Sequence, residues 1–351
     1  MNVQELLEKA VQDHASDIFI VAGLPASYRT DGNIVQLGDE KLKPDDTRTY
    51  LEQIYALAGE RNMDDLLTYG DDDFSFAIPT LSRFRVSAYK QRGTLSAVVR
   101  IITFSLPSPD ILGIPDVIIH AGNLPKGLVL VTGPAGSGKS TTLACVVNHI
   151  NETMEKHIIT LEDPLEFLHR HQKSIVSQRE INADTDSYVT ALRASLRQSP
   201  DVILLGEMRD YETIEVAMTA AETGHLVIST LHTIGAANTI DRIIDVFPAN
   251  QQRQIAVQLS MVLQAVVSQQ LVPGIDGKRI PAFEIMTVTP AIRNMIRDNK
   301  IPQIEGVIYS SNKEDMISMD NSLLNLYKNK RITAETALAY ASNPEMLKKK
   351  L

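Results

Sequence analysis

Hydrophobic side chains in the first hundred residues recur in patterns that predict a small domain of helices and strands. Two segments repeat apolar residues at helical spacing, and three others are short apolar or alternating runs typical of strands. In the clearest strand, Phe84, Val86 and Ala88 alternate with polar neighbours. Helices are predicted at residues 2–14 and 44–68, strands at 17–23, 83–89 and 95–102, and a hairpin turn at Asp31-Gly32. The order of these elements predicts an α+β domain over residues 1–104.

A different pattern begins after residues 105–115, a segment that holds three prolines and one glycine. This composition is typical of a linker, so we place a domain boundary there. Beyond it, short apolar runs alternate with helical patterns, which is typical of a mostly parallel sheet with helices on both faces. The apolar runs lie at residues 128–132, 158–161, 202–205 and 226–230. We therefore predict an α/β core over residues 116–289, followed by a helical region over residues 290–351.

Charge and cysteine content narrow the classes of protein to which this chain can belong. Its 34 basic and 43 acidic side chains give a formal net charge of −9, which argues against a protein that coats nucleic acid. The single cysteine, Cys145, excludes an intrachain disulfide and a cysteine-based zinc cluster. The N-terminus lacks the apolar region of a signal peptide, and no apolar run reaches the roughly 18 residues of a membrane span. We therefore expect a cytoplasmic protein without a membrane span.

The clearest chemical motif is the segment GPAGSGKST, which fits the pattern G-x4-G-K-[ST] between a predicted strand and a predicted helix. Glycines in such a loop allow backbone N–H groups to point at phosphate oxygens, and the helix N-terminus adds partial positive charge. We expect Lys139 to neutralise the β- and γ-phosphates of ATP, and Ser140 to hold Mg2+ through its hydroxyl. The predicted nucleotide-binding residues are Gly133, Pro134, Ala135, Gly136, Ser137, Gly138, Lys139, Ser140 and Thr141.

Carboxylates follow two of the predicted strands. Glu207 ends the segment DVILLGE, where we expect it to orient the attacking water, to act as its general base, or to approach Mg2+ through a water molecule. A structural role as a helix cap is the alternative for Glu207. Glu162, Asp163 and Glu166 lie close together after an earlier strand, and carboxylates this close favour a nearby cation. A solvated acidic turn is the alternative for these three residues.

Histidine and arginine residues supply further candidates. His225 and His232 flank the predicted strand at residues 226–230, and His232, at its C-terminal end, is the better candidate for a group that senses phosphate. Both could equally be structural histidines. Arg85 and Arg100 lie on neighbouring predicted strands of the first domain. Taken alone they are surface arginines, but guanidinium groups that face a nucleotide could stabilise charge on its γ-phosphate.

The segment AIRNMIRD near the C-terminus has the pattern of an amphipathic helix. Arg293 and Arg297 are four residues apart and share one face, whereas Ile292, Met295 and Ile296 lie on the other. An ordinary surface helix explains this pattern as well as a functional one does.

Together these motifs resemble the PilT-type ATPases that power type IV pilus retraction, within the larger superfamily of type II/IV secretion ATPases. LRQSPDVILLGEMRD at residues 196–210 is similar to the signature of the superfamily. ITLEDPLEFLH at 159–169 resembles its Asp box, and GHLVISTLHT at 224–233 resembles its His box. Residues 15–32 and 84–100 resemble the start and the arginine-bearing strands of a PAS-like domain.

The resemblance implies a PAS-like α+β domain, then a RecA-like P-loop ATPase domain, then a helical C-terminal region. It also implies a homohexamer that hydrolyses Mg-ATP, with an inner-membrane pilus platform protein as partner and a second motor ATPase as an optional one. Such a motor would act at the cytoplasmic face of the membrane, on protein and not on nucleic acid. The catalytic residues expected on this basis are Glu207, Glu162, Glu166, His232, Arg85 and Arg100.

Two features favour the retraction branch of the superfamily. AIRNMIRD is similar to the family motif AIRNLIRE, and the paired-cysteine zinc insertion of assembly and secretion motors cannot form with one cysteine. The departures from the family pattern remove no phosphate ligand and no catalytic carboxylate; they are Ala135, Ser199, Ile234, Met295 and Asp298.

Other functions stay open at this stage. One is an accessory nucleotide-binding ring that regulates a second motor, and another is a pilus-assembly or secretion ATPase. A RecA-like nucleic-acid motor is disfavoured, because the chain is acidic and no basic groove motif with aromatic residues is present.

Overall fold

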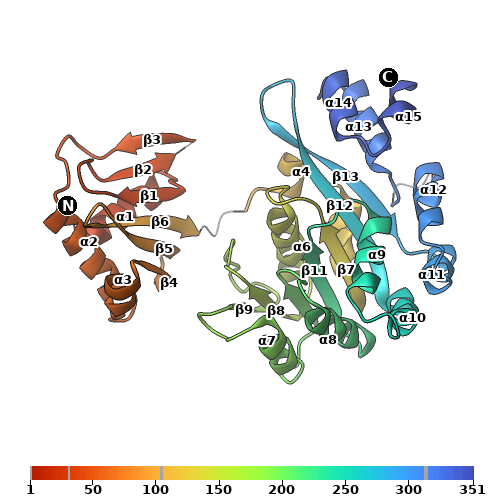
Figure 1. The fold of residues 1–351 in the computed structure, drawn as a ribbon, viewed down its shortest axis with the longest axis horizontal. Coiled ribbons are helices and arrows are strands. Elements are labelled where there is room, and N and C mark those ends of the chain that lie inside the picture. The colour runs from red at the N-terminus through yellow and green to blue at the C-terminus, as the bar shows by residue number, and fades with distance from the viewer. Residues whose placement is uncertain (1, 31, 103–105, 312–314) are drawn as a thin grey trace. The chain divides into compact units, whose positions relative to one another are not determined.

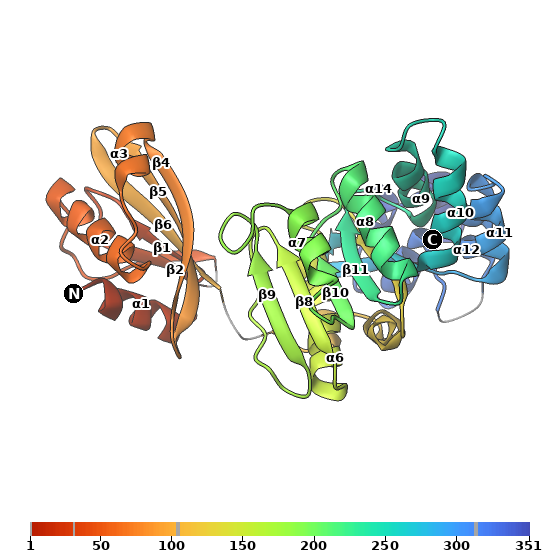
Figure 2. The same ribbon diagram turned by 90° about the horizontal axis from the view of Figure 1, so that it is seen from below.

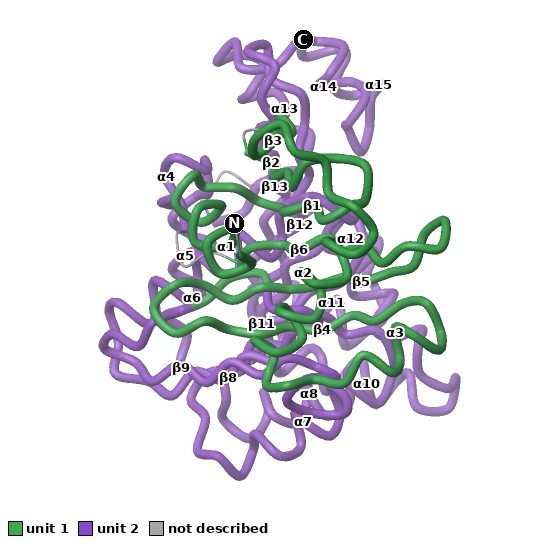
Figure 3. The backbone as a smooth tube through the Cα atoms, turned by 90° about the vertical axis from the view of Figure 1, so that its left-hand side faces the viewer, with its two compact units in different colours: residues 1–105, 166–168 green, residues 106–165, 169–351 purple. Residues whose placement is uncertain are grey.

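The computed structural model describes residues 2–30, 32–102, 106–311 and 315–351. The chain forms two compact units, residues 1–105 with 166–168 and residues 106–165 with 169–351 (Figure 3). Each unit has its own hydrophobic core, so each is described by itself.

The first unit is a six-stranded antiparallel sheet with helices packed on one side (Figures 1 and 2). The strand order is β3-β2-β1-β6-β5-β4. Leu6, Ile54 and Phe84 are completely buried between helices and sheet. Its elements are α1 (Val3–Gln12), β1 (Asp17–Ile20), β2 (Ser27–Thr30), β3 (Asn33–Gln36), α2 (Pro44–Leu57), α3 (Asp64–Tyr69), β4 (Asp71–Ile78), β5 (Ser82–Gln91) and β6 (Thr94–Ile102).

Local sequence accounts for most of these boundaries. Helix α1 begins with a capping box, in which the Asn2 side chain accepts a hydrogen bond from the Glu5 N–H at 2.8 Å and Glu5 accepts one from the Asn2 N–H at 2.9 Å. The segment 44–68, predicted to be helical, forms the two helices α2 and α3, because the chain leaves α2 through Gly59, whose φ of 78° is left-handed. β2 and β3 pair with Thr30 opposite Asn33, although residue 31 of the predicted turn lies outside the described residues.

The predicted linker at residues 105–115 begins outside the described residues, as does the end of the predicted first domain at residues 103–104. From Leu106 onward this segment belongs to the second unit. It forms the short helix α4 (Pro109–Leu112), and Leu106, Leu112 and Ile114 pack against the core of the second unit. The described part of the segment is therefore anchored by apolar contacts.

The second unit is built on a seven-stranded sheet in the order β13-β12-β7-β11-β10-β8-β9. All neighbours pair in parallel except β12 and β13, which are antiparallel. The prediction of a mostly parallel sheet is confirmed, while β9, β12 and β13 were not predicted. The strands are β7 (Gly127–Thr132), β8 (His157–Glu162), β9 (Ile175–Glu180), β10 (Val202–Leu205), β11 (Leu226–Leu231), β12 (Leu263–Pro273) and β13 (Arg279–Thr287).

Helices cover both faces of this sheet (Figure 1), and the period of two along each strand explains why. Leu128 and Leu130 of β7 pack into one core, whereas Val129 and Val131 pack into another. Both cores are apolar, so the strand reads as a continuous hydrophobic run. The helices are α5 (Asp116–His120), α6 (Lys139–Thr153), α7 (Tyr188–Ser195), α8 (Tyr211–Glu222), α9 (Ala236–Asp245) and α10 (Gln252–Val262).

The C-terminal helices belong to the same unit. They are α11 (Pro290–Arg297), α12 (Pro302–Ser310), α13 (Met319–Lys328), α14 (Ala334–Tyr340) and α15 (Pro344–Lys348). Half-buried Glu284 on β13 joins α13 to the sheet, because it accepts hydrogen bonds from the N–H groups of Ala236 at 2.8 Å and Met319 at 3.4 Å. One carboxylate thus caps the N-termini of α9 and α13. Within the described residues, no helix is long and apolar enough to cross a membrane.

Candidate active site

The predicted phosphate-binding loop joins the central strand β7 to helix α6. All six residues of β7 are buried, and the chain then turns through Gly133, Gly136 and Gly138, whose φ angles are 138°, 74° and 86°. These angles strain any residue with a side chain, so the loop needs glycine at these positions. Space imposes the same need at Gly133, where a Cβ would lie 2.1 Å from the backbone oxygen of Gln269.

Lys139, the first residue of α6, is folded back onto this loop. Its Nζ donates hydrogen bonds to the carbonyl oxygens of Gly133 at 2.8 Å and Pro134 at 3.0 Å. Burial lowers the pKa of the Lys139 ammonium, and the negative charge of Glu207 opposes that shift. The Ser137 hydroxyl is buried and has no hydrogen-bond partner among the described residues. An ammonium and an unpaired hydroxyl beside a helix N-terminus fit the oxygens of a phosphate chain.

The remaining loop residues are accessible to a ligand. Ala135 and Gly136 are exposed at the crest of the loop, and Ser140 is exposed in the first turn of α6. Magnesium bound to a nucleotide commonly takes one or two protein oxygens and several phosphate or water oxygens. The Ser140 hydroxyl, next to Lys139, fits that requirement.

Glu207 follows strand β10 at the same edge of the sheet, and the two neighbouring strands, β8 and β11, bind the backbone around it. The Gly206 N–H donates to the Leu161 carbonyl of β8 at 2.8 Å, and the Thr230 hydroxyl of β11 donates to the Gly206 carbonyl at 2.6 Å. The Met208 N–H also donates to the Thr230 carbonyl, at 3.1 Å. The backbone on both sides of Glu207 is therefore fixed.

The Glu207 carboxylate lies next to two basic side chains, those of Arg209 and His232. Arg209 forms an ion pair with its Oε1, and the Nε2 of His232 lies 3.4 Å from its Oε2. Burial raises the pKa of Glu207, but the hydrogen bond and charge of Arg209, together with those of His232, outweigh this and hold the pKa below its usual value. Glu207 is consequently a carboxylate near neutral pH, as an acceptor of hydrogen bonds from water must be.

The structure separates the two histidines of the predicted His box. His232 contacts Glu207, whereas His225 lies at the other end of β11, where its Nδ1 is 2.9 Å from the Ala220 carbonyl. His225 thus has a local structural environment near the end of α8.

Glu162 ends β8 and accepts a hydrogen bond from the Thr160 hydroxyl at 2.7 Å.

Three predicted site residues belong to the first unit. Glu166 lies in the segment 166–168, and Arg85 and Arg100 face each other in the register of β5 and β6. Arg100 donates to Asp17 at 3.0 Å, whereas the Arg85 side chain forms no hydrogen bond or ion pair with any other described residue. Two opposed guanidinium groups repel each other, so an anion beside them would be stabilising. The role of these three residues at a nucleotide stays a prediction.

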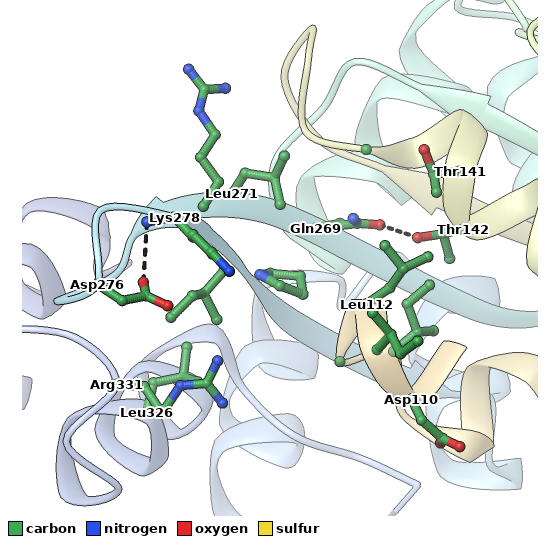
Figure 4. A pocket seen from close by; sticks show the side chains of 17 residues that line it. Asp110, Leu112, Thr141, Thr142, Gln269, Leu271, Asp276, Lys278, Leu326 and Arg331 are labelled. Atoms are coloured by element: carbon green, nitrogen blue, oxygen red, sulfur yellow. Dashed lines mark hydrogen bonds between the residues drawn. The ribbon is translucent and has the colours of Figure 1, made fainter. Parts of the chain in front are cut away.

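A cavity of about 540 Å³ opens next to the end of the loop (Figure 4). It lies between helix α4, the first turn of α6 and the hairpin of β12 and β13. Leu112 and Leu271 give it apolar walls, while Asp110, Lys278 and Arg331 place charges around it. This volume and mixed lining suit a small organic ligand.

Sequence reasoning missed Gln269, which braces the loop from β12. Its Oε1 accepts a hydrogen bond from the buried Thr142 hydroxyl at 2.7 Å (Figure 4). Its Nε2 lies 2.9 Å from where a Cβ on Gly138 would stand. The signal was present, because the polar triplet at residues 268–270 interrupts an apolar segment. Arg209 was also missed, although it lies two residues from Glu207.

The sequence matches the family described as "Type II/IV secretion system protein" over residues 1–280. The chain belongs to this family. It is 44% identical over 345 residues to the type IV pilus retractation ATPase PilT of Pseudomonas aeruginosa, covering 98% of this chain and 99% of that one. It is 49% identical over 276 residues to the twitching motility protein of Neisseria gonorrhoeae, covering 78% of this chain and 74% of that one.

Solved structures of family members support the same family assignment. The chain is similar to the crystal structure of the pilus retraction motor PilT with bound ADP, with a TM-score of 0.90, 44% identity and 99% of both chains covered. It is also similar to the ATPase DotB of Legionella pneumophila, with a TM-score of 0.80, 27% identity, and 96% of this chain and 95% of that one covered. These matches confirm the resemblance, the fold class with its N-terminal α+β domain and RecA-like core, and the prediction of an ATPase related to pilus retraction motors.

Proposed function

We propose that this chain assembles into a homohexamer that hydrolyses Mg-ATP and uses the energy to retract a type IV pilus. The observation that carries the proposal is the Glu207 carboxylate, which Arg209 and His232 hold at the edge of the sheet where the phosphate-binding loop also lies. ATP as the nucleotide is supported by the ADP bound in the PilT crystal structure. The retraction role is supported by the names of the relatives in Pseudomonas and Neisseria.

In this proposal, each residue of the loop has a defined task. Lys139 leaves the carbonyls of Gly133 and Pro134 and binds the β- and γ-phosphate oxygens. Ser140 holds Mg2+, which when bound supplies positive charge to the phosphate oxygens. The cavity beside Thr142 receives the base and ribose between its apolar walls.

Glu207 then accepts the proton of the attacking water as that water's oxygen bonds to the γ-phosphorus. Its lowered pKa keeps the carboxylate ionised, and its place after a buried strand fixes the direction of approach. Glu162 and Glu166 assist in orienting water, His232 senses the γ-phosphate through Glu207, and Arg85 and Arg100 add positive charge from the first unit. Because Arg85 has no anionic partner within the described chain, it is the freer of the two arginines.

The mechanical output follows from the loss of the γ-phosphate. Contacts that depend on it disappear on hydrolysis, and the first unit rotates relative to the second. Around a ring, such rotations displace a platform protein at the cytoplasmic face of the inner membrane and release pilin subunits. AIRNMIRD transmits this motion without contacting the nucleotide.

Steady-state hydrolysis of Mg-ATP by purified protein, measured against protein concentration, tests the proposal. We expect specific activity to rise with concentration as rings assemble, and Glu207→Gln to abolish it. Glu212→Gln is a matched control, because Glu212 pairs with Arg193 on exposed surface and should leave activity unchanged. Full activity in Glu207→Gln would refute the assignment of the base.

The accessory-ring function makes the opposite prediction. An assembled ring that binds ATP and never turns over, even with a membrane fraction that carries the pilus machine, would favour it over the motor.

A further inference from the structure

The first residue of α7, Tyr188, brings a hydroxyl to the point where the two strands of the active site end. A Cβ placed on Gly206 would lie 2.9 Å from the Tyr188 hydroxyl oxygen and 3.4 Å from the Cα of Glu162. Gly206 immediately precedes Glu207, so the hydroxyl lies beside the backbone that carries the proposed base. The Tyr188 ring is half-buried and packs against the sheet core.

The surroundings of this hydroxyl are acidic. Burial raises the pKa of Tyr188, as do the charges of Asp163, Glu207 and Glu162, while Arg209 acts against them. Tyr188 therefore keeps its proton at physiological pH and can donate it in a hydrogen bond. The hydroxyl makes no hydrogen bond with any other described residue, so packing alone does not account for it, since a phenylalanine ring would fill the same space.

We propose that the Tyr188 hydroxyl is a positioning group for hydrolysis, which donates a hydrogen bond to water beside the backbone that carries Glu207. This bond orders the attacking water in the orientation from which Glu207 accepts its proton. Tyr188 keeps its own proton throughout, the water oxygen bonds to phosphorus, and the β–γ bridging oxygen departs with ADP. The inference rests on the role proposed above for Glu207.

The test compares Tyr188→Phe with Tyr211→Phe. Tyr211 lies on α8 with its ring against Phe247, and it is 52% exposed, so its hydroxyl should be dispensable. A hydrogen bond within a charged site corresponds to roughly a 10-fold change in rate. We expect Tyr188→Phe to lower kcat about 10-fold with the KM for ATP within about twofold of wild type. Tyr211→Phe should match wild type in both.

Three further measurements separate positioning from structure. The melting temperature of Tyr188→Phe should stay close to that of wild type, because the ring is retained. Adding Tyr188→Phe to the inactive Glu207→Gln variant should leave its affinity for ATP within about twofold, because the hydroxyl acts on the attacking water and not on nucleotide binding. In mixtures of Mg-ATP and Mg-GTP, the ratio of the two hydrolysis rates should be the same in Tyr188→Phe as in wild type. The reason is that the adenine or guanine ring of the nucleotide lies elsewhere in the proposed site.

An unchanged kcat in Tyr188→Phe overturns the inference, and so does a raised KM with kcat retained or a large drop in melting temperature. If Glu207→Gln does not hydrolyse ATP while Tyr188→Phe is fully active, the inference about Tyr188 fails and the proposed base stands. If Glu207→Gln stays active, the proposed base fails first and the inference falls with it.

Discussion

Gln269 and Thr142 form a buried pair whose removal should loosen the phosphate-binding loop. The Thr142 side chain is completely buried, and its hydroxyl donates to Gln269 Oε1 at 2.7 Å. Gln269→Leu keeps most of the volume but leaves that hydroxyl without its acceptor. A buried polar group without a partner costs about 1–3 kcal/mol, and we expect the free energy of unfolding to fall by about 2 kcal/mol.

The companion change is Thr142→Val, which keeps the shape of the side chain and removes the donor. This variant leaves the Gln269 amide oxygen unpaired, so it should also be destabilised. In the double variant neither group remains, and its loss should be smaller than the sum of the two single losses by about 1 kcal/mol or more. Gln270→Leu is the control, because Gln270 points to the Tyr340 carbonyl and not to the loop.

Urea unfolding of wild type, the two single variants, the double variant and the control gives the free energies, and the KM for ATP reports on the conformation of the loop. We expect the KM to rise in Gln269→Leu, since the amide also lies against Gly138. Strict additivity of the two single losses would refute the reasoning, because it would mean that Gln269 and Thr142 act independently.

Further predictions concern the base and the C-terminal motif. Arg293 donates to the Ser260 carbonyl at 2.6 Å and the Met261 carbonyl at 2.9 Å, so Arg293→Ala should destabilise the protein by about 2 kcal/mol in urea unfolding. Arg297→Ala removes an exposed side chain, and its unfolding free energy should stay within about 0.5 kcal/mol of wild type while pilus retraction is lost in cells. The pKa of Glu207 is depressed below 4.5, so its ion pairs contribute stability above pH 4.5. That stability is lost as the pH falls through the lowered pKa. The difference in unfolding free energy between wild type and Glu207→Gln, measured from pH 7 to pH 3, should therefore shrink only below pH 4.5. Gly206→Ala should abolish hydrolysis and leave nucleotide binding by fluorescence titration intact, because the new Cβ would displace Tyr188 and press on the Leu161 carbonyl at 3.2 Å.

Motifs with a local physical cause were predictable from sequence. The phosphate-binding loop is such a case, because positive φ angles demand glycine and the strand and helix on each side have their own periodicity. The parallel sheet was predictable because β7, β10 and β11 are short, continuous apolar runs. Glu207 was found because the end of a parallel strand is where such a sheet presents its chemistry.

Features that depend on distant segments were not predictable. Strand β12 follows α10 directly and contains the polar triplet 268–270, so its periodicity does not indicate a buried strand. The partners of Arg293 are backbone carbonyls at the end of α10, which no spacing in the sequence reveals. Tyr188 reaches Gly206 only because α7 packs across β8 and β10, a contact that exists only in the folded chain.

The shared carboxylate of Glu284 has a mechanical consequence. It satisfies the first turns of two helices, one in the ATPase core and one in the C-terminal region, and a helix N-terminus that loses its acceptor inside a protein is costly. Sliding α13 past α9 would break at least one of these bonds. Stress that enters through α13 is therefore passed to β13 and to its neighbour β12, whose Gln269 contacts the phosphate-binding loop. The flexibility that the conformational change needs must therefore come from another part of the chain.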